Sequence, residues 1–334
     1  MIILAETPEL WRRYVEFLKG VDMNPFSDDG RQSFSQKEQQ CGDTFNNNGP
    51  YFHLCTPGKY TELLCETSDD YKFFVSLTAM AAAASGVKVV AFTIMSNHVH
   101  FVLCGAKTAC ELFFSVFKNK LKRYYISRQR YVKLDGFDPK LIQIDSLRQM
   151  RVEIAYTHRN AYMASDRFLP YSYPWSSGSL YFNPYAYHGD APAFNTIPFR
   201  EKMIICHGRV QELPENYTAR DGMILPESFC AIRFGEAFFR NAHHYYSVVS
   251  KNYEAYSEVA KALGDDVFLD DEELFAVIQI QSRKLFGEGR PSMLPQKDRL
   301  ALARTMKSEY NASAGQLQRM LRLDRSIVEE LFGK

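Results

Sequence analysis

The alternation of apolar and polar residues along the chain predicts most of its secondary structure. Residues 9–18 repeat apolar side chains at helical spacing, which predicts a short amphipathic helix. The segment 22–50 is polar and ends in Asn-Asn-Asn-Gly-Pro, which is typical of a linker or loop. From residue 51, strands are predicted at 51–56, 87–94 and 100–103, and helices at 68–85, 108–130 and 144–164.

The order of these elements predicts an α+β domain in which helices pack against a small antiparallel sheet. Residues 183–226 are interrupted by proline and glycine and follow no period, whereas the pattern is helical from residue 229 to the end. We therefore divide the chain into an N-terminal helix and polar linker (1–49), a sheet-containing domain (50–185), a connection (186–226) and an all-helical domain (227–334).

The composition is that of an ordinary globular protein. Of 334 residues, 46% are apolar and 24% charged, and at about 150 residues per domain this length predicts two domains. No apolar run approaches the roughly 18 residues that span a bilayer, and the first residues lack the basic region of a signal peptide. The seven cysteines contain no C-x-x-C pair, so neither a disulfide framework nor a zinc ribbon is expected. We expect a cytoplasmic protein without a membrane partner.

Charge is segregated along the chain although the net charge is only +1. Residues 116–160 hold eleven basic and four acidic side chains, and residues 281–334 hold eleven and six. Such blocks can be solvated faces, but two of them in separate segments favour a polyanionic partner such as a nucleic acid. The candidate contacts in the first block are Lys118, Lys122, Arg123 and Arg159.

Two histidines supply the first candidate chemistry. In a strand, positions i and i+2 project to the same face, so His98 and His100 are expected to present two neighbouring imidazoles. This arrangement suits a divalent metal whose other ligands are carboxylate, amide or phosphate oxygens. A solvated sheet face with two polar residues gives the same pattern.

A predicted helix carries the second group. Tyr156 and Asn160 are four residues apart, so they share one face of the helix over 144–164, with Glu153 beside them. A tyrosine phenol can act as a nucleophile when a cation or a metal-bound phosphate is near it, and an asparagine oxygen can ligate the same metal. A half-buried core tyrosine and a surface asparagine fit the spacing equally well.

Three motifs, in this order, resemble those of the HUH single-tyrosine transposases, in particular the REP-associated (RAYT) branch. Residues 95–100 (Met-Ser-Asn-His-Val-His) resemble the family's Met-Pro-Asn-His-Val-His, and residues 156–161 (Tyr-Thr-His-Arg-Asn-Ala) resemble its Tyr-Ile-His-Leu-Asn-Pro helix. Residues 173–177 (Tyr-Pro-Trp-Ser-Ser) match its downstream motif. Ser96 and Ala161 stand where the family usually has proline. The resemblance covers about residues 50–182.

The resemblance implies a ferredoxin-like catalytic domain that cuts and rejoins single-stranded or hairpin DNA. By position in the motifs, His98, His100 and Asn160 would bind Mg²⁺ or Mn²⁺. Tyr156 would attack the scissile phosphorus and give a 5′-phosphotyrosine and a free 3′-hydroxyl. The metal would polarise the phosphoryl oxygen and stabilise transition-state charge. The active site could form within one chain or across a homodimer.

The C-terminal end has a pattern that resembles a helix-turn-helix. Ser313 and Gln316 have capping-box spacing at the start of one predicted helix, and Asp324 precedes another. Arg325 and Ser326 would then begin the recognition helix and contact DNA. An ordinary helical-bundle tail is the alternative.

Three functional hypotheses follow from these patterns. The first is metal-dependent cleavage and strand transfer of single-stranded DNA through a phosphotyrosine. The second is a domesticated DNA-binding protein that keeps the fold without cleavage, against which the presence of all four proposed catalytic residues argues. The third is a metallohydrolase without a covalent step, in which the spacing of Tyr156 and Asn160 is coincidental.

Overall fold

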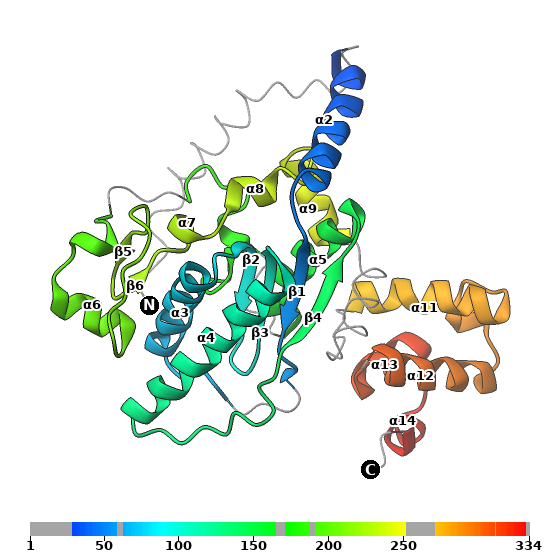
Figure 1. Cartoon of the computed structure of the whole chain (residues 1–334). Coiled ribbons are helices and arrows are strands. Elements are labelled where there is room, and N and C mark those ends of the chain that lie inside the picture. The colour runs from blue at the N-terminus through cyan, green and yellow to red at the C-terminus, as the bar shows by residue number, and fades with distance from the viewer. Residues whose placement is uncertain are drawn as a thin grey trace, which may run out of the picture.

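The computed structural model of the chain describes residues 29–58, 63–164, 171–186, 191–251, 271–310 and 312–331 (Figure 1). The helix predicted at 9–18 lies outside the described residues. Four strands form the central sheet: β1 (Tyr51–Cys55), β2 (Lys88–Ile94), β3 (Val99–Cys104) and β4 (Lys140–Ile144). They lie in the order β2-β3-β1-β4, and every neighbouring pair is antiparallel.

Two helices connect these strands. The first, α3 (Ser68–Ser85), runs from β1 to β2, and the second, α4 (Lys107–Ser127), runs from β3 to β4. A capping box begins α3, in which Thr67 and Asp70 each accept the other's backbone N–H. The helix ends at Gly86, whose φ of 72° is a left-handed conformation that glycine adopts without strain. The expected α+β arrangement with an antiparallel sheet is confirmed.

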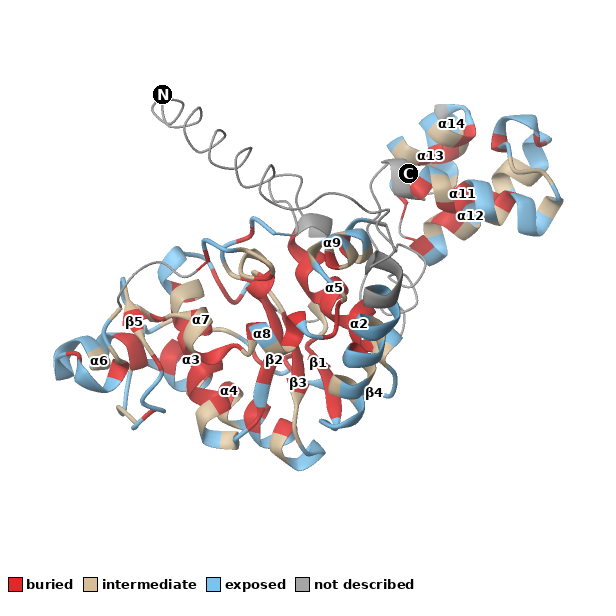
Figure 2. Cartoon of the chain, turned by 90° about the horizontal axis from the view of Figure 1, so that it is seen from above, coloured by how far each residue is buried: buried red, intermediate tan, exposed pale blue. Residues whose placement is uncertain are grey.

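The two faces of the sheet carry different side chains, because successive residues of a strand point to opposite sides. On one face, the ring of Phe101 lies 5.0 and 5.6 Å from those of Phe113 and Phe117 of α4. Its neighbour His100 points to the other face, where Cys55 of β1 lies directly opposite it in the ladder. Helix α5 (Leu147–Ala164) packs on this second face. Figure 2 shows buried residues gathered along the strands and the inner sides of α3 and α5.

Two segments differ from their predicted structure. Residues 29–46, expected to be a polar linker, form helix α2 (Asp29–Asn46). Residues 140–144 form β4, so the helix predicted from 144 begins only at Leu147. Helix α2 has few apolar residues, and polar contacts with distant residues help to hold it. Glu38 accepts two hydrogen bonds from Arg151 of α5, at 2.7 and 3.0 Å, and one from Arg240 at 2.9 Å.

The expected connection at 186–226 contains regular structure in its described part. It holds α6 (Phe199–Cys206) and a hairpin of β5 (Ala219–Arg220) and β6 (Met223–Ile224). The helices that follow are α7 (Pro226–Phe229), α8 (Ile232–Glu236) and α9 (Ala242–Lys251). Phe229, Phe238 and Tyr245 are buried in the same hydrophobic cluster as the sheet. The core of the sheet domain therefore extends past the boundary expected at 226–227.

The last four helices of the described chain belong to a second hydrophobic cluster, which includes Leu302, Leu317 and Leu321 and also residues of β1 and α5. They are α11 (Asp271–Phe286), α12 (Gln296–Tyr310), α13 (Ala314–Leu321) and α14 (Arg325–Leu331). The C-terminal part is thus mostly helical, as expected, and Ser313 and Gln316 form the expected capping box at the start of α13. Among the helices that the structure describes, none is long and apolar enough to cross a membrane.

Replacing Glu38 by glutamine (Glu38→Gln) should loosen the attachment of α2. The hydrogen bond from Arg151 is the main cause that lowers the pKa of Glu38 from 4.5 to about 2. The carboxylate therefore stabilises the docked helix above pH 4.5, and this effect is lost as the pH falls toward 2. Because the side chain is 38% exposed, we expect a loss of about 1 kcal/mol or less at pH 7.

Hydrogen exchange over residues 34–46 measures this loss: exchange should be faster in the variant at pH 7, and the difference should shrink between pH 4.5 and pH 2. The control is Glu111→Gln, because Glu111 and Lys107 are exposed and 4.0 Å apart. Equal exchange in wild type and Glu38→Gln at pH 7 would contradict the role given to Glu38.

Candidate metal centre and active site

His98 and His100 lie at the beginning of β3. The turn before this strand is closed by a hydrogen bond from the Met95 amide to the His98 carbonyl (2.9 Å), and β3 begins at Val99. The strand predicted at 100–103 thus begins at Val99, and the expectation that His98 follows the alternation of a strand is wrong, because His98 lies in the turn. The rings of His98 and His100 are still neighbours, with centroids 5.0 Å apart. His100 is fully buried and His98 is half-buried.

The loop after β1 holds the ring of His98 in place. The Asn97 side-chain amide donates to the Gly58 carbonyl (3.0 Å), and Asn97 Oδ1 lies 2.7 Å from His98 Nδ1. A Cβ atom on Gly58 would lie only 2.7 Å from the same Nδ1. A glycine is therefore needed for the loop to come this close, and the Nε2 side of His98 is left to face α5.

Helix α5 brings the predicted tyrosine and asparagine to the two histidines. The Asn160 amide lies between the rings, with Oδ1 3.1 Å from His98 Nε2 and Nδ2 3.0 Å from His100 Nε2. One turn earlier, the ring of Tyr156 lies 5.4 Å from that of His100. The turn, the strand and the helix thus bring together all four residues that the sequence singled out for chemistry.

The structure shows that His53 also belongs to this centre, where it contacts both His100 and Glu153. His53 Nε2 is 3.1 Å from His100 Nδ1, and His53 Nδ1 is 2.6 Å from a carboxylate oxygen of Glu153. Both side chains are buried. The sequence placed His53 in a strand and Glu153 beside Tyr156, but it gave no role to His53. The alternation of β1 puts His53 and Cys55 on the same face of their strand. Only the pairing of β1 with β3 shows that this face meets His100.

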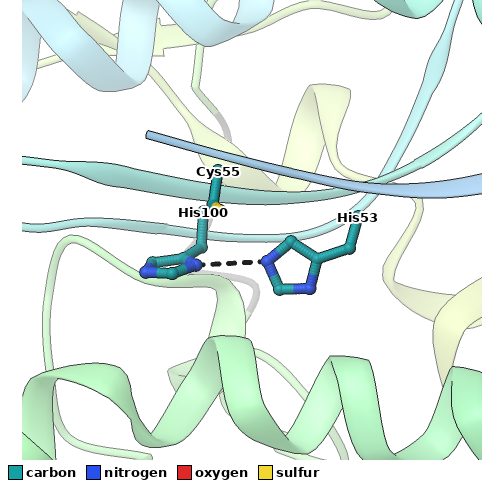
Figure 3. Close-up of side chains that lie close together, drawn as sticks. All are labelled: His53, Cys55 and His100. Atoms are coloured by element: carbon teal, nitrogen blue, oxygen red, sulfur yellow. Dashed lines mark hydrogen bonds between the residues drawn. The ribbon is translucent and has the colours of Figure 1, made fainter. Parts of the chain in front are cut away.

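Cys55 completes a group of three buried side chains with His53 and His100 (Figure 3). One ligand atom from each residue lies within 4.8 Å of those of the other two. The close-up shows both imidazoles leaving the sheet on the same side, with Cys55 on the strand beside His100. Two imidazoles and a thiol are a donor set that can hold a metal ion.

Burial keeps the central imidazole neutral. Loss of hydration lowers the pKa of His100 well below its ordinary value of 6.5, and the neighbouring His98 and His53 rings lower it further. A neutral imidazole has one nitrogen lone pair available for a metal. With the Asn160 amide turned, His98, His100 and Asn160 offer two nitrogens and one oxygen. This mixed donor set fits a divalent cation such as Mn²⁺.

The Tyr-Pro-Trp-Ser-Ser segment at 173–177 lies along the outer edge of β2. The Ile94 amide donates to the Trp175 carbonyl (2.9 Å), and the Phe92 amide donates to Ser177 Oγ (2.9 Å). The same Oγ is 2.9 Å from Nε2 of His158 in α5. Burial lowers the pKa of His158 to about 3, so this histidine is neutral. The segment therefore joins the sheet edge to the helix that carries Tyr156.

The candidate DNA contacts do not surround this centre. Lys118, Lys122 and Arg123 belong to α4, which covers the opposite face of the sheet, and Lys118 pairs with Asp138 at 2.7 Å. Arg159 is 2% exposed, so it does not belong to an exposed basic surface.

At the other end of the chain, Arg325 and Ser326 begin α14 as expected. Ser326 is exposed, and the side chain of Arg325 lies outside the described part. The candidate contacts are thus divided among α4, the buried side of α5 and the C-terminal helices.

The hydrophobic cluster of the C-terminal helices includes Tyr156. Tyr156 is 2% exposed and belongs to one cluster with Cys55 and Val152 and with Leu274 and Val277 of α11. The candidate nucleophile is therefore buried where α5 meets this cluster.

Comparisons with protein-family models, with curated proteins and with solved structures find no match to this chain. The geometry of the site must therefore support a function by itself.

Replacing Ser177 by alanine (Ser177→Ala) should destabilise the domain without weakening metal binding. The change leaves the buried Phe92 amide and His158 without the Ser177 hydroxyl, which we expect to cost about 1–3 kcal/mol in the free energy of unfolding. Chemical denaturation measures this loss, and Mn²⁺ titration measures the affinity. Ser179→Ala is the control, because its hydroxyl makes a longer contact of 3.4 Å. Wild-type stability of Ser177→Ala would contradict the joining role of this serine.

Proposed function

We propose that the chain is a metal-dependent, single-strand DNA endonuclease and strand transferase of the HUH single-tyrosine type. The observation that carries this proposal is the meeting of Tyr156, His98, His100 and Asn160 from separate elements in one buried centre. Asn160 lies within 3.1 Å of both imidazoles, and Tyr156 packs against His100. The metallohydrolase hypothesis also accounts for the contacts of Asn160 with both histidines, but it gives no role to Tyr156, which packs against His100.

The topology also supports the proposal. The elements β1, α3, β2, β3, α4 and β4 follow one another along the chain, and the sheet order is β2-β3-β1-β4. This is the βαββαβ arrangement of ferredoxin-like domains. It agrees with the catalytic domain that the sequence resemblance implies, although a fold of this kind also hosts many other functions.

In the proposed reaction each residue has one role. His98 and His100 would hold a cation through Nε2, and Asn160 would add its amide oxygen; such a cation would supply positive charge beside the scissile phosphate. Tyr156 Oη attacks the phosphorus and gives up its proton as the O–P bond forms. The bond to the 3′-oxygen of the preceding nucleotide breaks, this oxygen takes up a proton and leaves as a hydroxyl, and the 5′-phosphate remains on the tyrosine. Attack by a later 3′-hydroxyl reverses these bonds and releases Tyr156.

The DNA partner is proposed to be a single strand or a hairpin. The exposed Lys122 and Arg123 of α4 supply positive charge on the other side of the sheet, and the basic side chains of α12 and α13 supply more near the C-terminal end. Phosphate contacts there would position the nucleic acid rather than take part in the chemistry. Because Tyr156 is 2% exposed, access of a phosphate requires the cluster around α11 to open. A homodimer, with the site in one chain or across two, is compatible with this requirement.

The second candidate is a DNA-binding protein that keeps the fold without cleavage. The burial of Tyr156 favours it, because a tyrosine that stays covered cannot reach a phosphorus atom. Detection of a covalent adduct distinguishes the two candidates directly.

Replacing Tyr156 by phenylalanine (Tyr156→Phe) should abolish covalent attachment to a single-stranded oligonucleotide, because only the attacking oxygen is removed. Wild-type protein with Mn²⁺ and a labelled hairpin library should give an adduct of reduced mobility on a denaturing gel, and the variant should give none. Tyr131→Phe is the control, because this tyrosine is 89% exposed and belongs to no part of the site. Adduct formation by Tyr156→Phe at the wild-type rate would place the nucleophile elsewhere.

Replacing His98 by alanine (His98→Ala) should weaken Mn²⁺ binding by about tenfold or more and stop cleavage, because one of the three proposed donors is lost. Electron paramagnetic resonance of free Mn²⁺ measures the affinity. Chelation by EDTA should stop cleavage by the wild type, and added Mg²⁺ or Mn²⁺ should restore it. His243→Ala is the control, because His243 is exposed on α9. Unchanged cleavage in EDTA would rule out the metal.

A further inference from the structure

A continuous chain of polar contacts passes through the centre from one hydrogen-bond acceptor to another. It begins at the Glu153 carboxylate and ends at the Gly58 backbone carbonyl. Between them, the described residues make six successive contacts of 2.6–3.1 Å, which join Glu153, His53, His100, Asn160, His98, Asn97 and Gly58 in this order.

This series of contacts lacks one hydrogen when its three imidazoles are neutral and the Glu153 carboxylate is ionised. In that state each imidazole and each amide donates on one side and accepts on the other. The five groups then supply five hydrogens for six contacts, because the carboxylate and the Gly58 carbonyl only accept. One contact therefore lacks a hydrogen, and either an added proton or a metal cation at that contact supplies the missing positive charge.

Two contacts offer further donors to such a cation. Around Asn160, the cation meets His98 Nε2, His100 Nε2 and the amide oxygen, which is the hard-metal position of the proposed function. His53 Nε2 and His100 Nδ1 are 3.1 Å apart, and Cys55 belongs to the same group, in which one ligand atom of each residue lies within 4.8 Å of those of the other two. Two imidazoles and a thiolate prefer a softer ion such as Zn²⁺.

The surroundings of the second position fit a zinc site. Glu153 accepts from Nδ1 of His53, and this carboxylate–histidine pairing fixes the tautomer that turns Nε2 toward a metal. Cys55 and His100 are paired across β1 and β3, and His53 lies two residues before Cys55 on the same face (Figure 3). All three side chains are therefore held by the sheet, and each is 0% exposed.

We propose that His53, Cys55 and His100 form a buried soft-metal site for Zn²⁺, and that Zn²⁺ there excludes the hard metal at Asn160. The exclusion follows from His100, whose neutral ring has one lone pair. As long as the ring keeps its one proton, metal at Nδ1 leaves that proton on Nε2, and metal at Nε2 leaves it on Nδ1; only an imidazolate, which has lost this proton, would bind both metals. The exclusion depends on the hard-metal site of the proposed function, whereas the zinc site itself does not.

The first experiment uses metal-free, full-length protein and Co²⁺ as a spectroscopic substitute for Zn²⁺. Co²⁺ should give a thiolate-to-cobalt charge-transfer absorption that Zn²⁺ abolishes by displacement. Cys55→Ser should lose this absorption, and Cys65→Ser should keep it, because Cys65 is also buried but lies outside the group. Absence of the absorption in wild type, or its persistence in Cys55→Ser, would overturn the site.

X-ray absorption of the zinc-loaded wild type requires no variant, so it decides the question if Cys55→Ser does not fold. The expected zinc shell has one sulfur and two imidazole nitrogens. A shell without sulfur, or with more than one sulfur, would overturn the proposal.

The exclusion is tested by titrating Mn²⁺ into wild type with and without one equivalent of Zn²⁺. Zinc should weaken Mn²⁺ binding by about tenfold or more in wild type and have less effect in Cys55→Ser. Simultaneous full binding of both metals would overturn the exclusion. Asn160→Ala should lose Mn²⁺ binding and keep the cobalt–thiolate absorption, so failure of the hard-metal site and failure of the zinc site give different results.

Discussion

The need to satisfy buried polar groups between the sheet and α5 is the constraint on which the centre depends. Burial of His100, His53 and Glu153 removes their hydration, so each must find a partner within the protein. The contacts that result fix the ring planes of the histidines and help to hold α5 on the sheet, where it packs against β2 and β3. The same loss of water keeps His100 neutral, which makes its lone pair available to a cation.

The parts of the molecule outside the centre hold α5 in the position that this network requires. Ser177 and Trp175 bind the edge of β2, and Ser177 also contacts His158. On the other side, Glu38 of α2 holds Arg151 near the start of α5. A helix fixed in this way presents Tyr156 and Asn160 in a constant register. The Tyr-Pro-Trp-Ser-Ser segment at 173–177 therefore positions α5.

The exposed basic residues of α4 and the candidate catalytic residues lie on opposite faces of the sheet. The basic residues of α4 lie across the sheet from the candidate metal centre, and the C-terminal helices share one hydrophobic cluster with Tyr156 of α5. In the proposed function, nucleic acid bound through these surfaces would reach Tyr156 only when the cluster opens. Binding and cleavage would then be separate steps, and the burial of the nucleophile would protect it between them.

The sequence by itself determined features that depend on residues close together along the chain. The capping box and Gly86 set the bounds of α3, and the four-residue spacing placed Tyr156 and Asn160 on one helical face. Only the tertiary structure decided which strands are neighbours, and hence that His53 and Cys55 meet His100. It also decided that α2 is a helix, because its partners Arg151 and Arg240 are more than a hundred residues away. Periodicity encodes the direction in which a side chain points, but contacts between distant residues depend on packing that no local pattern contains.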